Sequence, residues 1–264
     1  MKHLHGLTML ATAALLFGLT SSPALARKSS KAKPEVQYPD TTRQAPKLDL
    51  HSEKDQKKLQ DGLNALNSGD KAKATEVLQD LLDTSKSKYA QAMALRGLAL
   101  LKYQAGDYKG SIALIQRALA DGVVPNDDYF AIEYMLAAVQ QADGQYQASL
   151  DTIQKWRAEG KKETAESYAI EGNDLYRLEK YPEAIAAIKK AQSLTDKPEP
   201  QWNQILMASY SAAGQGDEVV KLAQQELAAN PDDPARLSAA ITALQQAGKY
   251  PEAIKLMEEA RAKG

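Results

Sequence analysis

Histidine and cysteine are the residues that most often perform nucleophilic, acid–base or zinc chemistry, and both are scarce in this sequence of 264 residues. Cysteine is absent, and the three histidines are His3, His5 and His51. His3 and His5 lie in a segment that we expect to be removed, so a single histidine remains. No Ser-His-Asp or Cys-His arrangement, and no zinc site with two such ligands, can be built from it. We therefore predict no catalytic or metal site of these kinds.

Other residues that could do chemistry have simpler interpretations. The Gly-Gln-Gly run at residues 214–216 is typical of a turn between helices, not of a phosphate-binding loop after a strand. The pairs Asp127-Asp128 and Asp232-Asp233 precede predicted helices, where carboxylates cap free amides and meet the helix dipole. The pair Glu258-Glu259 lies on the outward face of the last predicted helix. We predict that the protein is not an enzyme and uses no cofactor.

The elements that carry these residues repeat along the chain. The hexapeptide KYPEAI occurs at residues 180–185 and again at 249–254, which are 69 positions apart, about twice a 34-residue period. Six turn anchors can be aligned in phase with it. Their first residues are Gly69, Gly106, Gly144, Glu179, Gly214 and Gly248. Apolar residues at helical spacing precede and follow each anchor, so each unit is predicted to be two helices joined at the anchor.

Small residues recur at fixed distances from the anchors, for example Ala74, Ala184 and Ala253 five positions after them. Helices can cross closely only where side chains are small. In these features the sequence resembles the tetratricopeptide repeat (TPR) family. The resemblance implies an all-α fold, in which residues 53–264 form about six helix-turn-helix repeats in a right-handed superhelix.

Two segments precede the predicted repeats. Residues 1–26 have a weakly positive start, an apolar run and the small-residue site Ala24-Leu25-Ala26, which together predict a signal peptide cleaved after Ala26. Residues 27–52 are rich in proline and small polar residues, which predicts a disordered linker. We expect an exported, periplasmic protein. No cysteine follows the cleavage site to carry a lipid, so we expect no stable membrane anchor.

The charge balance argues against a nucleic-acid partner. The chain has 33 basic and 34 acidic residues and a formal net charge of −1, whereas nucleic-acid-binding domains usually show a basic excess or stripe. We therefore predict protein partners. In TPR proteins the first helix of each repeat lines a concave groove, and the resemblance assigns these in-phase residues to that groove: Arg96, Tyr103, Tyr134, Gln141, Asn173, Tyr176 and Gln204.

Two interpretations of the groove tyrosines stay open, because tyrosine serves both peptide recognition and packing between helices. Trp156 and Trp202 are predicted to pack. The last predicted helix ends the array without a capping helix. Either its own charges cover that end, or it pairs with another molecule such as a second copy of the chain, which makes a homodimer one hypothesis.

A narrower resemblance involves the C-terminal quarter. Pro200-Gln201-Trp202 with Leu206 and Tyr210, and the stretch from Gly248 to Ala260, are similar to periplasmic TPR proteins that accompany TonB–ExbB–ExbD systems. The leading hypothesis is a non-catalytic periplasmic scaffold that mediates protein–protein interaction as an accessory of TonB-dependent outer-membrane transport. TonB, ExbB and ExbD would then be the partners. The alternatives are an adaptor in envelope assembly or cell division, or an activator of a peptidoglycan hydrolase.

Overall fold

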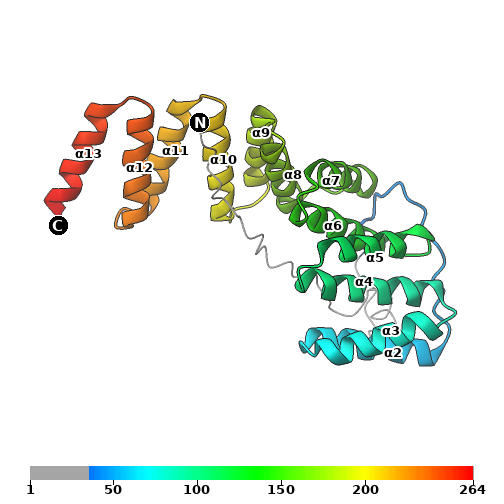
Figure 1. The fold of residues 1–264 in the computed structure, drawn as a ribbon. Helices are drawn as coiled ribbons and strands as arrows, with labels where there is room; N and C mark the ends of the chain where they lie inside the picture. The colour runs from blue at the N-terminus through cyan, green and yellow to red at the C-terminus, as the bar shows by residue number, and fades with distance from the viewer. Residues whose placement is uncertain (1–35, 264) are drawn as a thin grey trace. The chain divides into compact units, whose positions relative to one another are not determined.

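The structure, a computed structural model, describes residues 36–263. The predicted signal peptide and residues 27–35 lie outside this range. Within it the protein has twelve α-helices and no strands, which confirms the all-α prediction (Figure 1). The helices are α2 (Glu53–Asn67), α3 (Lys71–Thr84), α4 (Lys88–Gln104), α5 (Tyr108–Ala120), α6 (Asn126–Ala142), α7 (Tyr146–Gly160), α8 (Ala165–Arg177), α9 (Tyr181–Ser193), α10 (Pro200–Ala212), α11 (Gly216–Ala229), α12 (Pro234–Gln246) and α13 (Tyr250–Lys263).

The helices form six pairs, and the chain divides into two compact units. Unit 1 ends at Lys162 and contains α2 to α7, and unit 2 begins at Glu163 and contains α8 to α13. In each pair the first, or front, helix packs on the second, or back, helix, as in α4 with α5 and α8 with α9. Back helices also pack on the next front helix, as α3 does on α4 and α9 on α10. This is the alternation that the sequence repeat predicts; the handedness of the superhelix stays a prediction.

The anchors are the turns between paired helices, and they require an unusual backbone conformation. Five of the six anchors are glycines with φ between 72° and 78°, a left-handed region that glycine enters without steric cost. The fourth anchor has Glu179 instead, and its φ is 61°. An L-residue there is strained by contact of its Cβ with the backbone. The repeat geometry therefore prevails over local preference at this turn.

Close approach of paired helices explains the small residues in the pattern. A Cβ added to Gly62 or to Gly97 would lie 2.6 Å from a methyl carbon of Leu78. In the fourth repeat, a Cβ on Gly172 would lie 2.6 Å from the side chain of Ile188. At these three glycines, on α2, α4 and α8, a large back-helix side chain thus fills the space that the front-helix glycine leaves, and any larger residue would push the helices apart.

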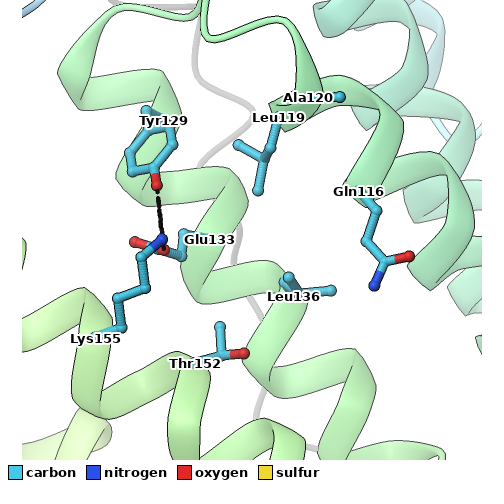
Figure 2. A pocket seen from close by; sticks show the side chains of 8 residues that line it. All are labelled: Gln116, Leu119, Ala120, Tyr129, Glu133, Leu136, Thr152 and Lys155. Carbon is cyan, nitrogen blue, oxygen red and sulfur yellow. Dashed lines mark hydrogen bonds and ion pairs between the residues drawn. The ribbon is translucent and has the colours of Figure 1, made fainter.

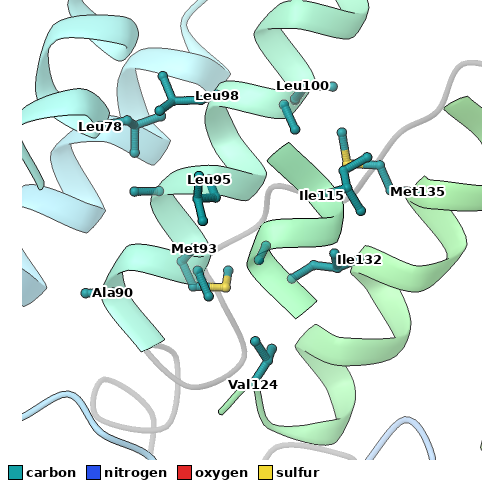
Figure 3. Close-up of a cluster of buried hydrophobic side chains, with 14 of the residues drawn as sticks. Leu78, Ala90, Met93, Leu95, Leu98, Leu100, Ile115, Val124, Ile132 and Met135 are labelled. Atoms are coloured by element: carbon teal, nitrogen blue, oxygen red, sulfur yellow. The ribbon is translucent and has the colours of Figure 1, made fainter. Parts of the chain in front are cut away.

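The core of unit 1 is continuous from pair to pair. Figure 3 shows side chains of α4, among them Met93 and Leu100, meeting Ile115 of α5 and Ile132 and Met135 of α6. All are buried, and together they belong to one cluster that extends from α2 to α6. In unit 2 the core around α11 to α13 is built mostly from small residues, such as Ala223, Ala240 and Ala243. Within residues 36–263, every helix falls short of the length and hydrophobicity that a membrane span requires.

Residues 36–51, here called the N-terminal strap, differ from the expectation of a disordered segment. The backbone is non-helical, yet Tyr38 is buried between aromatic rings of unit 1. Its ring centroid lies 4.4 Å from that of Phe130 and 5.8 Å from that of Trp156. Gly160 makes room for it, since a Cβ there would lie 3.1 Å from the tyrosine ring. A single well-placed aromatic side chain thus anchors a segment with few apolar residues.

The strap then crosses the ends of successive helices of unit 1. The backbone N–H of Thr42 donates to the carbonyl of Glu159 at the end of α7, at 3.2 Å. The Arg43 guanidinium donates to the side chain of Asn126 at 2.7 Å and lies 4.1 Å from the Tyr129 ring centroid. These partners come from the ends of α7 and the beginning of α6, where backbone groups lack helical partners.

The strap ends against α2 and α4. The Ser87 hydroxyl, which caps α4, donates to the carbonyl of Asp49, and the backbone N–H of Lys88 donates to the Asp49 carboxylate at 3.1 Å. Leu50 is buried in the unit 1 core. The strap therefore joins the third helix pair to the first through contacts that no local sequence pattern encodes.

Replacement of the strained anchor residue, Glu179→Gly, is expected to stabilise the protein by about 1 kcal/mol, because glycine removes the Cβ strain but loses more entropy on folding. The measurement is urea-induced unfolding followed by circular dichroism. Gly214→Ala is the matched control: nothing lies within 4 Å of its added Cβ, so the strain of φ 72° alone should destabilise the protein by a similar amount. A loss of stability in Glu179→Gly would contradict this account.

Removal of the strap's aromatic anchor, Tyr38→Ala, is expected to lower the free energy of unfolding by roughly 3 kcal/mol, because it leaves a cavity between Phe130 and Trp156. Limited proteolysis should then cleave the strap before the helices. Val36→Ala is the control, since Val36 belongs to the same strap but is 51% exposed, and its change should stay within about 0.5 kcal/mol. Equal effects of the two substitutions would refute the anchoring role of Tyr38.

Candidate functional site

The residues predicted for the groove all lie on front helices. Arg96 and Tyr103 are on α4, and Tyr134 and Gln141 are on α6, all in unit 1. Unit 2 holds the other three, Asn173 and Tyr176 on α8 and Gln204 on α10, and α8 and α10 are in contact. Their surroundings differ, so each group is described separately below.

Arg96 has a partner inside the protein. It is 6% exposed, and its guanidinium lies 3.7 Å from the carboxylate of Asp128 in the first turn of α6. The Tyr89 hydroxyl donates a hydrogen bond of 2.9 Å to the other oxygen of that carboxylate. Burial lowers the pKa of Arg96 and the negative charge of Asp128 opposes that change. The arginine thus links α4 to α6 by a buried ion pair, which is costly to break from either side.

This pair also corrects the interpretation of Asp127-Asp128 as residues that precede and cap a helix. Helix α6 begins earlier, at Asn126, and the residue before it, Pro125, makes no side-chain cap. Asp128 is instead a buried member of the first turn. The other predicted cap is confirmed: the carboxylate of Asp233 accepts a 2.8 Å hydrogen bond from the backbone N–H of Ala235 at the start of α12.

The tyrosines predicted for the groove take part in packing. Tyr103 and Tyr176 occupy the same place in the second and fourth repeats, and each is half-buried against the tyrosine that starts the following back helix. The ring centroids of Tyr103 and Tyr108 are 5.7 Å apart, and those of Tyr176 and Tyr181 are 5.9 Å apart. These pairs fasten the front helix to the back helix within one repeat, while part of each ring still faces solvent.

Tyr134 is also half-buried, with its ring centroid 5.5 Å from that of Trp156. Trp156 is almost fully buried, and its indole N–H donates to the Phe130 carbonyl at 2.8 Å. Trp202 is equally buried, so both tryptophans pack as the sequence predicts.

The polar residues of the predicted groove are more open. Gln141 and Asn173 are half-buried, and Gln204 is exposed. Front helices α6, α8 and α10 therefore present amide and phenol groups at least partly to solvent.

A pocket of about 320 Å³ lies on a different surface, among α5, α6 and α7. Figure 2 shows it between the side chains of Leu119 and Leu136 on one side and those of Tyr129, Glu133 and Lys155 on the other. Its lining residues are Gln116, Leu119, Ala120, Tyr129, Glu133, Leu136, Thr152 and Lys155. Two of its three helices are back helices, and none of the residues predicted for the groove lines it.

A half-buried ion pair forms the polar wall of the pocket. The Lys155 ammonium lies 2.7 Å from the Glu133 carboxylate and 3.0 Å from the Tyr129 hydroxyl. The Glu133 side chain is 3% exposed, and its second oxygen, Oε2, has no hydrogen-bond partner. Burial raises the pKa of Glu133, and hydrogen bonding to Lys155 opposes that rise. The carboxylate therefore depends on Lys155 for its charge.

The sequence did not single out this cluster. Its only local sign is the spacing of Tyr129 and Glu133, which are four residues apart on one helix and therefore share a face. Lys155 joins them from the next helix. Within residues 36–263, no group of three or more histidine, aspartate or glutamate side chains is placed to hold a metal ion.

Comparison with known proteins agrees with this architecture. The fold is that of a helical-repeat protein built from helix pairs. Residues 59–129 match the model of the tetratricopeptide repeat family. The matched stretch runs from α2 to the first turn of α6. The chain thus shares the fold of TPR proteins, and residues 59–129 carry the family's sequence pattern.

Solved structures with the same fold share little sequence with this chain. A tetratricopeptide repeat protein from Parabacteroides merdae ATCC 43184 aligns with a TM-score of 0.62 at 15% identity, covering 80% of each chain. MamA from Desulfovibrio magneticus RS-1, residues 41 to the end, aligns with a TM-score of 0.54 at 20% identity, covering 67% of this chain and 98% of that one. No curated protein matches the sequence. At these identities the likeness establishes the fold alone.

Loss of the ammonium in Lys155→Met is expected to destabilise the protein by roughly 2 kcal/mol at pH 7, because the buried Glu133 carboxylate loses its charged partner. The penalty should shrink toward pH 4. A carboxyl whose folded pKa is raised binds its proton more tightly in the folded state, so its contribution to stability is fully present below the unfolded value and is lost as pH rises through the folded pKa.

Urea-induced unfolding at pH 4 and pH 7 measures both quantities. The double variant Lys155→Met with Glu133→Gln is the control, since it carries no carboxyl at this site and should lose the added pH dependence. A Lys155→Met penalty that is equal at both pH values would show that Glu133 does not depend on Lys155 for its charge.

Proposed function

We propose that this protein is an exported, periplasmic scaffold that performs no catalysis and holds partner proteins on its front helices. The TPR fold is typically an interaction scaffold, which gives the general class. The observation that carries the proposal further is the partial exposure of Tyr134 and Gln141 on front helix α6 of unit 1 and, separately, of Asn173 and Tyr176 on front helix α8 of unit 2. Phenol and amide groups combine contact area with hydrogen bonding, which suits recognition of a peptide segment.

Arg96 is excluded from this binding surface. Its burial and its ion pair with Asp128 give it a structural role between α4 and α6. Tyr103 contributes mainly to the packing of its own repeat through Tyr108. Among the seven residues predicted for the groove, those that remain for a partner are therefore amides and tyrosines, and none of them is cationic.

The proposed partners are components of TonB-dependent outer-membrane transport. The support is the resemblance of the C-terminal quarter to periplasmic TPR proteins of TonB systems. Three of the residues that carry it, Trp202, Leu206 and Tyr210, are buried. They indicate a shared way of packing repeats, so the identity of the partner depends on experiment. Export rests on the signal-peptide pattern in residues 1–26.

A photoreactive amino acid at Tyr134 and, separately, at Tyr176 tests the partner in living cells, followed by mass spectrometry of the cross-linked species. Capture of TonB, ExbD or a TonB-dependent receptor at either position would support the proposal. Capture of an envelope-assembly factor or a peptidoglycan hydrolase would replace it with one of the alternatives. The control position is Lys109, which is exposed on the back helix α5. Capture at Lys109 alone would overturn the front-helix site.

Export is tested independently by cell fractionation and by the mass of the mature protein. Recovery from the periplasmic fraction with Arg27 at the N-terminus is the expected result. A cytoplasmic protein that retains residues 1–26 would refute export and, with it, any role in the periplasm.

A further inference from the structure

The pocket among α5, α6 and α7 contains an unused hydrogen-bond acceptor. Glu133 lines this pocket, and its side chain is only 3% exposed. Its two neighbouring donors serve the same oxygen, Oε1: the Lys155 ammonium lies 2.7 Å from it and the Tyr129 hydroxyl 3.3 Å. The other oxygen, Oε2, has no hydrogen-bond partner. A buried carboxylate oxygen in this state has lost its hydration without compensation, so a ligand that donates a hydrogen bond to it gains free energy.

The donors that line the pocket are already engaged. Lys155 donates to Glu133 and Tyr129, and its ammonium also lies 3.8 Å from the carboxylate of Glu159. Tyr129 directs its single O–H to Glu133. The Thr152 hydroxyl is the donor in two contacts of 2.8 Å with other acceptors of α6 and α7. The hydrogen-bonding capacity left on these side chains is therefore that of acceptors.

The wall opposite this polar cluster is apolar. Figure 2 shows the side chains of Leu119 and Leu136 across the pocket from Tyr129 and Lys155. Ala120, next to Leu119, also lines it. The volume of about 320 Å³ lies at the lower end of the range for small-molecule pockets, so the space suits one ring system or one large side chain.

The charges around the pocket favour a neutral ligand. Arg43 of the strap interacts electrostatically with Glu133 and Glu159, so two cations, Arg43 and Lys155, balance two carboxylates. A cationic ligand on Oε2 would lie close to the Lys155 ammonium and be repelled by it. An anionic ligand would be repelled by Glu133 itself. The ligand that fits is therefore an uncharged hydrogen-bond donor with an apolar body.

Neutral donors differ in whether they also bring an acceptor. An amide or phenol carries an oxygen that would enter a pocket whose donors are engaged, and that oxygen would stay unpaired. The N–H of an indole is a donor only. Its flat apolar ring also matches the wall formed by Leu119 and Leu136. Indole thus satisfies Oε2 and leaves no polar atom of its own without a partner.

A ligand reaches Oε2 through a rotation of the carboxylate. In the structure this atom has almost no surface open to water. The terminal torsion of a glutamate side chain is broad, so the carboxylate of Glu133 can turn Oε2 toward the pocket at little cost. Lys155 is 51% exposed on a flexible stem, which allows its ammonium to follow the carboxylate.

We propose that this pocket binds an indole group, whose N–H donates to Oε2 of Glu133 and whose ring packs against Leu119 and Leu136. The indole belongs either to a free small molecule or to a tryptophan side chain of a partner protein, and the chemistry of recognition is the same for both. The proposal does not depend on the function proposed above, because none of the residues predicted for the groove lines the pocket.

Titration of the isotope-labelled full-length mature protein with indole, followed by amide chemical shifts in NMR spectra, tests the proposal. Saturable binding with a dissociation constant on the order of 0.1–1 mM is expected for so small a ligand, with the shifts centred on the pocket. Benzofuran is the matched ligand, since it has the same shape with an oxygen in place of the N–H. It should bind at least about tenfold more weakly. Equal affinity for the two ligands, or no saturable binding of indole, would overturn the proposal.

A variant that fills the pocket locates the binding site. Ala120 is exposed and lines the pocket, so Ala120→Trp should place a ring in the space and abolish indole binding. Ala113→Trp is the matched control, an exposed alanine of the same helix that does not line the pocket, and should leave the affinity unchanged. Circular dichroism verifies that both variants stay folded. Indole binding that Ala120→Trp leaves unchanged would place the ligand elsewhere and refute the assignment.

The source of the indole is tested with N-acetyltryptophanamide, which carries the ring on a peptide-like backbone. Affinity for this compound equal to or above that for indole would support a tryptophan of a partner protein. Weaker binding than that of indole, at the same residues, would support a free small molecule.

Discussion

Each helix pair in this protein must be covered by its neighbours, and this constraint explains most of the structure. A pair buries one set of apolar residues internally but exposes a second set, which only the following pair can cover. The cover needs helices in close contact. Glycines on the front helices allow this close contact, because Gly62 and Gly97 leave the space that the Leu78 side chain occupies. The same constraint keeps the turn at Glu179 in a left-handed conformation that local preference opposes.

Unit 1 adds contacts that the repeat alone does not require. The strap contacts the third helix pair through Tyr38 and Arg43 and the second through Asp49, and the Arg96–Asp128 pair joins α4 to α6. These contacts link residues that are distant in sequence, so they stiffen an array whose repeats otherwise touch only their neighbours. Unit 2, around α11 to α13, relies on a core of small residues instead. The contacts of the strap and of Arg96 therefore hold the front helices of unit 1 in fixed positions within that unit.

Function in such a protein depends on which side chains remain after packing has been satisfied. Trp156, Trp202 and Arg96 are used internally, and Tyr103 and Tyr176 are used in part. On the front helices, amide and phenol groups stay at least partly exposed to solvent. Amide and phenol groups of this kind suit recognition of a hydrophilic peptide segment.

The sequence by itself determined the features that depend on local periodicity. The all-α class, the six helix pairs, the turn positions and the sites of small residues all follow from apolar spacing and from anchors that recur about every 34 to 38 residues. Only the tertiary structure decided the docking of the strap, the ion pair of Arg96 and the Glu133–Lys155 pocket. The physical reason is that each of these joins different segments of the chain, and a packed tyrosine or a paired arginine has the same sequence signature as an exposed one. The repeat identifies Ile254 of α13 as the equivalent of Ile185, but the exposure of each isoleucine depends on what packs beside it.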